Sequence, residues 1–328
     1  MLKPELKDKL ICIFGASTDE HGFYIDNMRH YIKNQEDKTY FVNRAIGGSY
    51  AAFAVNISSD DVFTCNPDAV IVHFGGNDLG YHTYSDNLEE TPELLATREK
   101  KLQVFYENMT ILVKKLKEKV PKVILASLYP CDVMIKEKEE IATVADNEEK
   151  AKKFTSHIYT RATMKKANEG IKKFNAAVEK IAKEQQVDYV DVYTPLFQAV
   201  VTSGGLHKED GIHFSKKGHS LLAKAYLEYL GYENVPEEFE EGDPKCKELF
   251  DLEQTERHVQ FFRRYLFYPA TDTDRDCKTD EDIRKLVDEF LATPNYGFLS
   301  FARVAKANFD KFYDLREEIL KKTFELYK

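Results

Sequence analysis

The sequence predicts an α/β protein in which a five-stranded parallel sheet lies between two layers of helices and is followed by a helical C-terminal extension. Short apolar runs that end in Gly, Pro or polar residues alternate with longer stretches in which apolar residues recur every three or four positions. This alternation is typical of a parallel sheet covered on both faces, a three-layer α/β/α arrangement. It continues to about residue 230, so we expect an α/β domain over 1–230 and the extension over 231–328.

Five short apolar runs are the predicted strands. The first, Leu10–Phe14, is followed by Gly15 and has the length and composition of a buried strand in a parallel sheet. The other four runs occupy residues 39–43, 69–74, 123–129 and 187–193. Crossovers between parallel strands are right-handed, and we expect the strand order 2-1-3-4-5.

Helical patterns lie between these runs. Amphipathic stretches cover residues 22–33, 102–120, 164–181 and 217–230. Residues 131–160 are charged and show little periodicity, which predicts an inserted loop with room for one exposed helix. A second loop is expected between the fifth strand and Asp210.

The pattern changes near Gly231. Residues 234–243 are acidic and contain Pro and Gly, which is typical of a linker. Three helix-like stretches with aromatic stripes follow, at 249–268, 280–291 and 298–327. These stripes need a partner surface, either on the α/β domain of the same chain or on a second copy in a homo-oligomer. We expect packing within the chain.

Composition excludes several classes of partner. The chain has 47 Lys and Arg against 56 Asp and Glu, a net charge of −9, so no broad basic face for nucleic acid is expected. No apolar run approaches the ~20 residues of a membrane span. The five cysteines lack CxxC spacing and the N-terminus lacks an apolar signal segment, which together predict a reduced, cytoplasmic protein. A signal removed from the sequence as given is the alternative.

Four loops at the carboxyl ends of predicted strands carry residues suited to catalysis. Ser17, Gly48 and Asn77 follow the first three strands, and Asp210 and His213 follow the fifth. Open α/β sheets bind ligands at this edge. A serine hydroxyl needs a base to act as a nucleophile, which His213 can supply. Asp210, three residues earlier, can orient the imidazole and stabilise its charged form.

The same loops offer hydrogen-bond donors for an oxyanion. The candidates are the N–H groups of Ser17 and Gly48 and the side-chain amide of Asn77. Glycine suits this role because the backbone must approach the substrate closely. Each residue also has a simpler interpretation: Ser17 as a helix cap, Asn77 as a turn residue, and the Asp210–His213 segment as a structural loop.

The segments FGAST, NRAIGGS, GGND and DGIH, in this order, resemble the sequence blocks of the SGNH/GDSL hydrolase superfamily across residues 8–230. The resemblance implies a flavodoxin-like SGNH fold and ester hydrolysis without cofactor or metal. It implies Ser17 as nucleophile and first oxyanion donor, Gly48 and Asn77 as the other donors, His213 as base and Asp210 as its partner. The implied substrate is a small-molecule or oligosaccharide acyl ester, often an acetylated carbohydrate.

One position departs from the family pattern. Ala16 stands where the first block usually has an aspartate, so the sequence leaves open what braces the Ser17 loop. Two other functions fit the same residues. One is acyl transfer to an alcohol, and the other is a non-catalytic carbohydrate-binding or scaffolding protein on this fold.

Further side chains near these loops are candidates to line a substrate pocket. We name Tyr81, His82 and His207, because aromatic faces suit sugar rings and all three flank the predicted site. Tyr84 and Tyr129 could serve similarly. His73 lies within a predicted strand, and we expect it to be packed.

Two other motifs carry little weight. Residues 272–276 begin like an EF-hand loop, but Cys277 and Ile283 stand where that loop needs Gly and Glu. The glycines after the first three strands do not form GxGxxG, so no dinucleotide site is expected.

Overall fold

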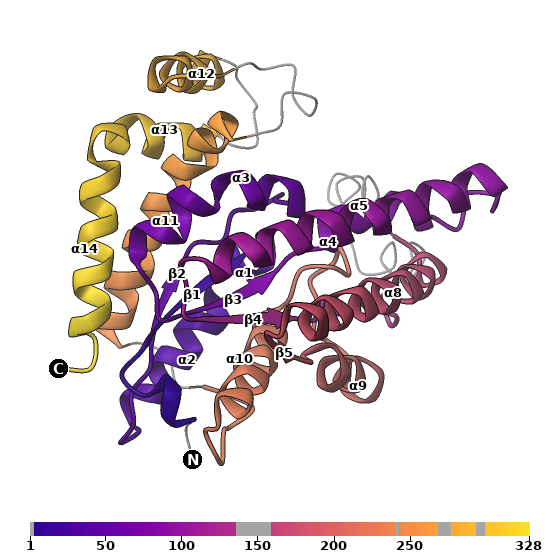
Figure 1. Ribbon diagram of the computed structural model, residues 1–328, viewed down its shortest axis with the longest axis horizontal. Coiled ribbons are helices and arrows are strands. Elements are labelled where there is room, and N and C mark those ends of the chain that lie inside the picture. Colours follow the sequence, from indigo (N-terminus) through magenta and orange to yellow (C-terminus); the bar gives the residue numbers. More distant parts are fainter. Residues whose placement is uncertain (1–2, 136–158, 240–242, 268–276, 293–298) are drawn as a thin grey trace, which may run out of the picture.

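A computed structural model describes residues 3–135, 159–239, 243–267, 277–292 and 299–328. The strands form one parallel sheet in the order β2-β1-β3-β4-β5, which confirms the predicted order (Figure 1). Their bounds are β1 (Leu10–Gly15), β2 (Tyr40–Asn43), β3 (Ala69–His73), β4 (Lys122–Ala126) and β5 (Asp188–Val190).

The register brings the carboxyl ends of the first three strands together. Ile13 of β1 is opposite Asn43, the last residue of β2, and Gly15 is opposite His73, the last residue of β3. The chain leaves the sheet at the same edge after each of these strands. The loops that carry Ser17, Gly48 and Asn77 therefore start side by side.

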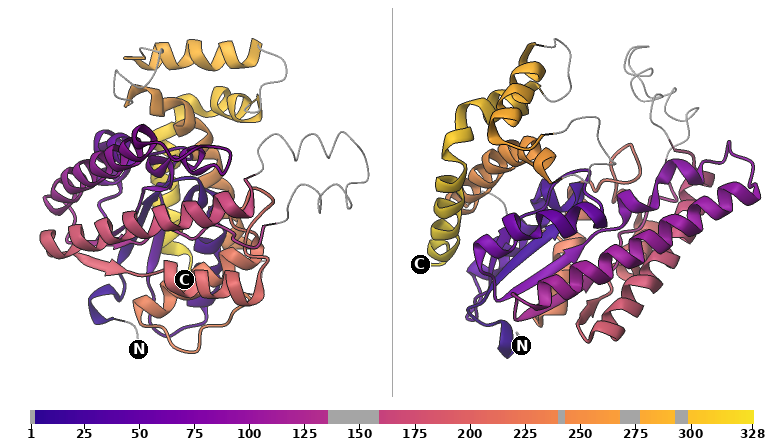
Figure 2. Two further views of the ribbon diagram at one scale, coloured as in Figure 1. Left: turned by 90° about the vertical axis from the view of Figure 1, so that its right-hand side faces the viewer. Right: turned by 45° about the horizontal axis from the view of Figure 1, so that its top comes forward.

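Alternate residues of each strand belong to two separate hydrophobic cores, because successive side chains of a strand point to opposite faces of the sheet. Cys12 and Phe14 pack beneath α3 (Ala51–Asp61), α5 (Pro92–Lys117) and α8 (Arg161–Gln185). Ile11 and Ile13 pack beneath the helices of the other layer, which are α2 (Phe23–Lys33), α9 (Tyr193–Ser203) and α10 (Lys216–Leu230). The two helical layers are visible on either side of the sheet in Figure 2.

Three helices differ from the predictions. Helix α3 was not predicted, because its sequence has almost no division into an apolar and a polar face. Such a sequence suits its position, since α5 covers it. Helix α9 replaces the loop expected after the fifth strand. Helix α5 begins at Pro92, behind the cap Thr91, so its first turns precede the apolar stripe and project beyond the sheet (Figure 1). Most of the predicted insertion, residues 136–158, lies outside the described residues.

The extension consists of α11 (Pro244–Arg263), α12 (Asp280–Ala292), α13 (Leu299–Asn308) and α14 (Phe312–Glu325). The helix expected over 298–327 is broken by a 3₁₀ turn, Phe309–Lys311. Helix α11 packs on α2 and α14 packs along β2 (Figure 1). The extension thus covers one edge of the sheet in the same chain.

Two kinds of contact hold the extension in place. Cys246, Leu249 and Ile319 join the core on the α3 side of the sheet, while the aromatic stripes also form a core of their own around Phe262 and Phe290. Buried ion pairs cross the junction as well. Arg29 pairs with Glu253, Arg44 pairs with Glu256, and Arg316 pairs with Asp60 and Asp61.

The pair between Arg29 and Glu253 is bidentate. Its two N–O distances are 2.9 and 2.7 Å, and both side chains are at most 1% exposed. Removing one partner of such a pair costs about 3–5 kcal/mol, because it leaves a buried charge uncompensated. As for membranes, none of the described helices combines the length and the apolar character that spanning a bilayer requires.

Candidate active site

Ser17 is the first residue of α1 (Ser17–His21), the short helix that follows β1. Its Oγ lies 2.8 Å from Nε2 of His213, and Nδ1 of His213 lies 2.7 Å from a carboxylate oxygen of Asp210. Three side chains from opposite ends of the α/β domain thus form one hydrogen-bonded chain. The serine hydroxyl contacts the imidazole rather than capping its helix.

Asp210 is held in its ionised form. Burial alone would raise the pKa of Asp210, but hydrogen bonds from the His213 ring and from the N–H groups of Ile212 and His213 outweigh burial and lower the pKa to about 2. The carboxylate therefore carries its charge at neutral pH, where it can stabilise a protonated imidazole.

The loop carrying His213 is fixed from both sides. His207 and Phe214 form an antiparallel bridge that closes the loop into a narrow turn. The start of α10 then approaches this turn closely, because a Cβ on Gly218 would lie only 2.1 Å from the carbonyl oxygen of Leu206. These contacts set the direction from which the imidazole reaches Ser17.

Gly48 and Asn77 border the same cavity as Ser17 and His213, a hollow of about 320 Å³. Gly48 has a φ of +76°, which glycine adopts without strain. The Asn77 amide nitrogen donates one hydrogen bond to the carbonyl of Ser49 at 2.7 Å, which ties it to the glycine loop. The amide has a second N–H, which this bond leaves unused.

The brace of the Ser17 loop is Asp19, which the sequence analysis missed. One of its carboxylate oxygens accepts hydrogen bonds from Nδ1 of His73 at 2.8 Å and from the N–H of Ala16 at 3.2 Å. The other accepts from the hydroxyls of Tyr129 at 2.6 Å and Tyr24 at 2.9 Å. Asp19 is fully buried, so these four donors replace its hydration shell.

These donors also decide the charge of Asp19. Burial would raise its pKa, but the His73 ring and the hydrogen bonds from His73, Tyr129 and Tyr24 hold the pKa of Asp19 below the usual value. The sequence feature that could have indicated this role is an acidic residue two positions after Ser17, on the same short helix. Its carboxylate turns back to Ala16, the position where the family usually has aspartate.

The glycine loop is held by the C-terminal extension. Arg264, which follows α11, donates a hydrogen bond of 2.6 Å to the carbonyl of Gly47, and its guanidinium stacks on the ring of Phe261. Glu20 of α1 accepts a hydrogen bond from the backbone N–H of Gly47. Gly47 is therefore held at its carbonyl by Arg264 and at its N–H by Glu20.

The residues predicted to line a substrate pocket do not all lie beside Ser17. Tyr81, Tyr129 and His73 line the cavity beside Ser17. His82 and His207 do not line it. His82 is exposed, and His207 is buried with its Nε2 2.8 Å from the carbonyl of Pro130. The acidic motif at 272–276 lies outside the described residues.

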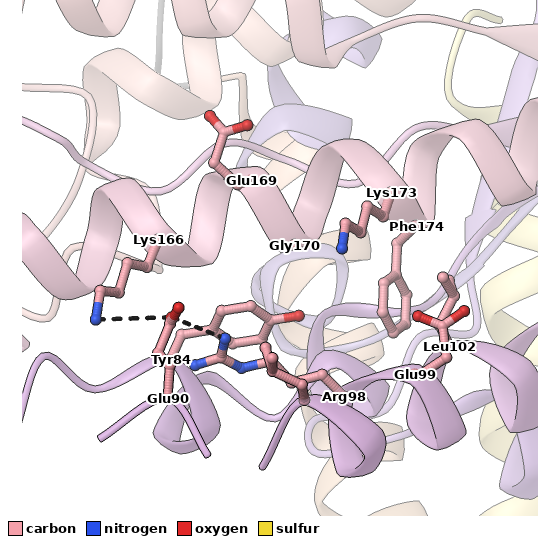
Figure 3. A pocket seen from close by; sticks show the side chains of 11 residues that line it. Tyr84, Glu90, Arg98, Glu99, Leu102, Lys166, Glu169, Gly170, Lys173 and Phe174 are labelled. Atoms are coloured by element: carbon pink, nitrogen blue, oxygen red, sulfur yellow. Dashed lines mark hydrogen bonds and ion pairs between the residues drawn. The ribbon is translucent and has the colours of Figure 1, made fainter. Parts of the chain in front are cut away.

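Tyr84 belongs to another cavity, of about 430 Å³, between α5 and α8 (Figure 3). There the Arg98 guanidinium lies over the Tyr84 ring, and both Arg98 and Lys166 pair with Glu90. Gly170 of α8 makes room for the ring, since a Cβ there would lie 2.5 Å from it. None of the predicted catalytic residues lines this cavity.

Comparison with known proteins places the chain in a family. The profile of the GDSL-like lipase/acylhydrolase family matches residues 14–221. No curated protein matches the chain by sequence. Among solved structures, BT4096, a gut microbial diltiazem-metabolizing enzyme, is 14% identical with a TM-score of 0.64, covering 100% of this chain and 97% of its own.

A variant of Axe2, an acetyl xylan esterase from Geobacillus stearothermophilus, is 19% identical with a TM-score of 0.50, covering 70% of this chain and 98% of its own. At these identities the neighbours show a shared fold. With BT4096 that fold includes the C-terminal helices. The family match covers more than half of the sequence, including the loops of Ser17, Gly48, Asn77 and His213. The chain therefore belongs to the GDSL-like lipase/acylhydrolase family and is a carboxylic ester hydrolase.

Proposed function

We propose that the protein is a serine esterase that removes small acyl groups, with acetyl groups on carbohydrates as the preferred class. Ser17 is the nucleophile, His213 the general base and Asp210 the group that orients it. The observation that carries this proposal is the continuous hydrogen-bonded chain from Ser17 through His213 to Asp210.

The proposed reaction uses these residues in two half-reactions. His213 Nε2 takes the proton of Ser17 as Oγ attacks the acyl carbonyl carbon, and the N–H groups of Ser17 and Gly48 and the amide of Asn77 stabilise the oxyanion. His213 then gives the proton to the leaving alcohol. Water, activated by the same imidazole, attacks the acyl-enzyme and releases the carboxylic acid.

The size and lining of the cavity favour a short acyl group. Its volume is about 320 Å³, and its apolar wall contains Phe74, Leu128 and Ile212. Tyr81 and Tyr129 add aromatic faces on which a sugar ring can pack. The neighbouring fold of an acetyl xylan esterase supports the same substrate class.

The test compares wild type with Ser17→Ala on p-nitrophenyl acetate and p-nitrophenyl octanoate, together with labelling by a fluorophosphonate. We expect turnover that favours acetate, covalent labelling of wild type only, and loss of turnover in Ser17→Ala with unchanged folding. A carbohydrate-binding protein without catalysis would show neither turnover nor labelling. Product analysis with an added sugar acceptor then separates hydrolysis from acyl transfer.

A further inference from the structure

A second cavity, of about 540 Å³, lies where the extension meets the α/β domain. Its walls come from α2, from the start of α10 with the loop before it, and from the first turns of α11. Phe23, Asp26 and His30 line it from α2, and Lys247 and Phe250 line it from α11. This cavity shares no lining residue with the one beside Ser17.

Three potential metal ligands of different chemistry lie close together beside this cavity, and two of them, Asp26 and His30, line it. Asp26 and His30 are four positions apart on α2, which puts them on one face of the helix. Cys246 lies in the first turn of α11 and is fully buried. One donor atom from each residue lies within 4.8 Å of the other two, and His30 Nε2 is 3.5 Å from Asp26 Oδ2.

Two polar groups here have unmet hydrogen-bonding capacity. In the described part of the chain, Oδ1 of Asp26 is shielded from solvent and has no hydrogen-bond partner. The same holds for both ring nitrogens of His219, which is 1% exposed and forms part of the wall of the same cavity. Unsatisfied buried polar atoms cost free energy, which a bound cation and its water ligands would recover.

We propose that Asp26, His30 and Cys246 bind a divalent transition metal, with Zn²⁺ as the best match. A set of one carboxylate, one imidazole and one thiolate suits zinc among the common divalent ions. Ligand atoms at zinc bond lengths stand about 3.3–3.8 Å apart in a tetrahedron, and the His30–Asp26 distance of 3.5 Å falls within that range.

A metal at this place joins the α/β domain to its extension. Helices α2 and α11 already pack on one another, and the ligands come from both. The site differs in residues and location from the Ser17 cavity, so the proposal does not depend on the esterase mechanism. The competing explanation is a metal-free network, in which His30 hydrogen-bonds Asp26 and Cys246.

Titration of the metal-free full chain with Co²⁺, followed by displacement with Zn²⁺, separates the two explanations. We expect one equivalent of Co²⁺ to produce a sulfur-to-cobalt charge-transfer band and the visible bands of a tetrahedral ion, and Zn²⁺ to abolish both. Zn²⁺ should also raise the unfolding temperature, as for any ligand that binds only the folded state.

Ligand variants give the decisive comparison. Cys246→Ser should lose the charge-transfer band, and Asp26→Asn and His30→Gln should weaken Zn²⁺ binding at least ~10-fold in calorimetry. Cys277→Ser, which changes a cysteine elsewhere in the extension, should bind like wild type. If Cys246→Ser does not fold, His30→Gln decides. Wild type that binds no stoichiometric metal, or binding that all three ligand variants retain, would overturn the proposal.

Discussion

The two loops that meet beside Ser17 are held by different parts of the molecule. The serine loop is braced from inside the α/β layers, by the buried carboxylate of Asp19 and its donors His73 and Tyr129. The glycine loop is held in addition from outside them, because Arg264 of the extension donates to the carbonyl of Gly47 while Glu20 of α1 accepts from its N–H. The family match ends at residue 221, so Arg264 lies outside the matched region.

This difference shows how an added segment takes part in a site without supplying a reacting group. Arg264 contacts the peptide before Gly48, so it can set where the Gly48 N–H points. Ser17, in contrast, depends on side chains of neighbouring strands and helices. Variants in the two braces should therefore affect different properties of the protein.

The largest effect should come from breaking the link between the serine loop and its base. His213→Ala removes the group that accepts the Ser17 proton, so we expect kcat on p-nitrophenyl acetate to fall at least ~10³-fold with an unchanged unfolding temperature. Asp210→Asn should lower kcat less than His213→Ala does, because the imidazole base remains. Activity of His213→Ala within ten-fold of wild type would contradict the proposed base.

Loss of the inner brace should lower stability and activity together. Each carboxylate oxygen of Asp19 accepts two hydrogen bonds. In Asp19→Asn an NH₂ group replaces one of these oxygens, so two hydrogen-bond donors would face another donor. We expect a stability loss of about 3 kcal/mol by denaturant unfolding and a fall in kcat of about 10²-fold. Asp68→Asn, at the opposite end of β1, should change neither by much; equal effects there would show that Asp19 has no special role.

Loss of the outer brace should reduce catalysis more than stability. Arg264→Ala frees the Gly47 carbonyl and the peptide before Gly48, and we expect kcat to fall about 10-fold while KM and the unfolding temperature change little. Arg284→Ala is the matched control, because it changes the same extension at α12, which lies away from α1 in Figure 1. If both variants keep full kcat, the extension does not position the glycine loop.

The last effect concerns pH and is expected at His219, a buried histidine of α10. Burial lowers the pKa of His219 to about 3, and the unfolded chain takes up that proton near pH 6.5. Between these values the unfolded state binds more protons, so stability falls as pH falls, by about 2 kcal/mol at pH 5. His219→Phe, which keeps an aromatic ring against Tyr24, should show a shallower decline in unfolding free energy between pH 7 and pH 5.

The sheet could be predicted from the sequence because each strand is a short apolar run with a defined end. Alternation with helices indicates that the strands are parallel, although it is compatible with more than one strand order. Ser17, Gly48 and Asn77 could be named because each follows the end of a strand, and parallel strands bring such ends to one edge. His213 is separated from β5 by α9, and it could be named from the DGIH segment that contains it.

The braces could not be predicted, because they depend on tertiary contacts between residues with no fixed spacing. Asp19 reads as an ordinary acidic residue in the first turn of a helix, and only the folded chain brings Tyr129 to it. Arg264 reads as one of two adjacent arginines in an amphipathic helix. Helix α3 was missed for a related reason, since a helix buried on most sides has little periodicity.

The bidentate pair of Arg29 and Glu253 has a consequence for the order of events during biosynthesis. Every strand of the sheet is translated well before Glu253, so the nascent α/β layers hold a guanidinium whose counter-charge has not yet emerged from the ribosome. Until α11 packs on α2, the Arg29 guanidinium must remain hydrated, and the surface around it remains exposed to solvent. The last stage of folding of these layers therefore waits until α11 has been synthesised.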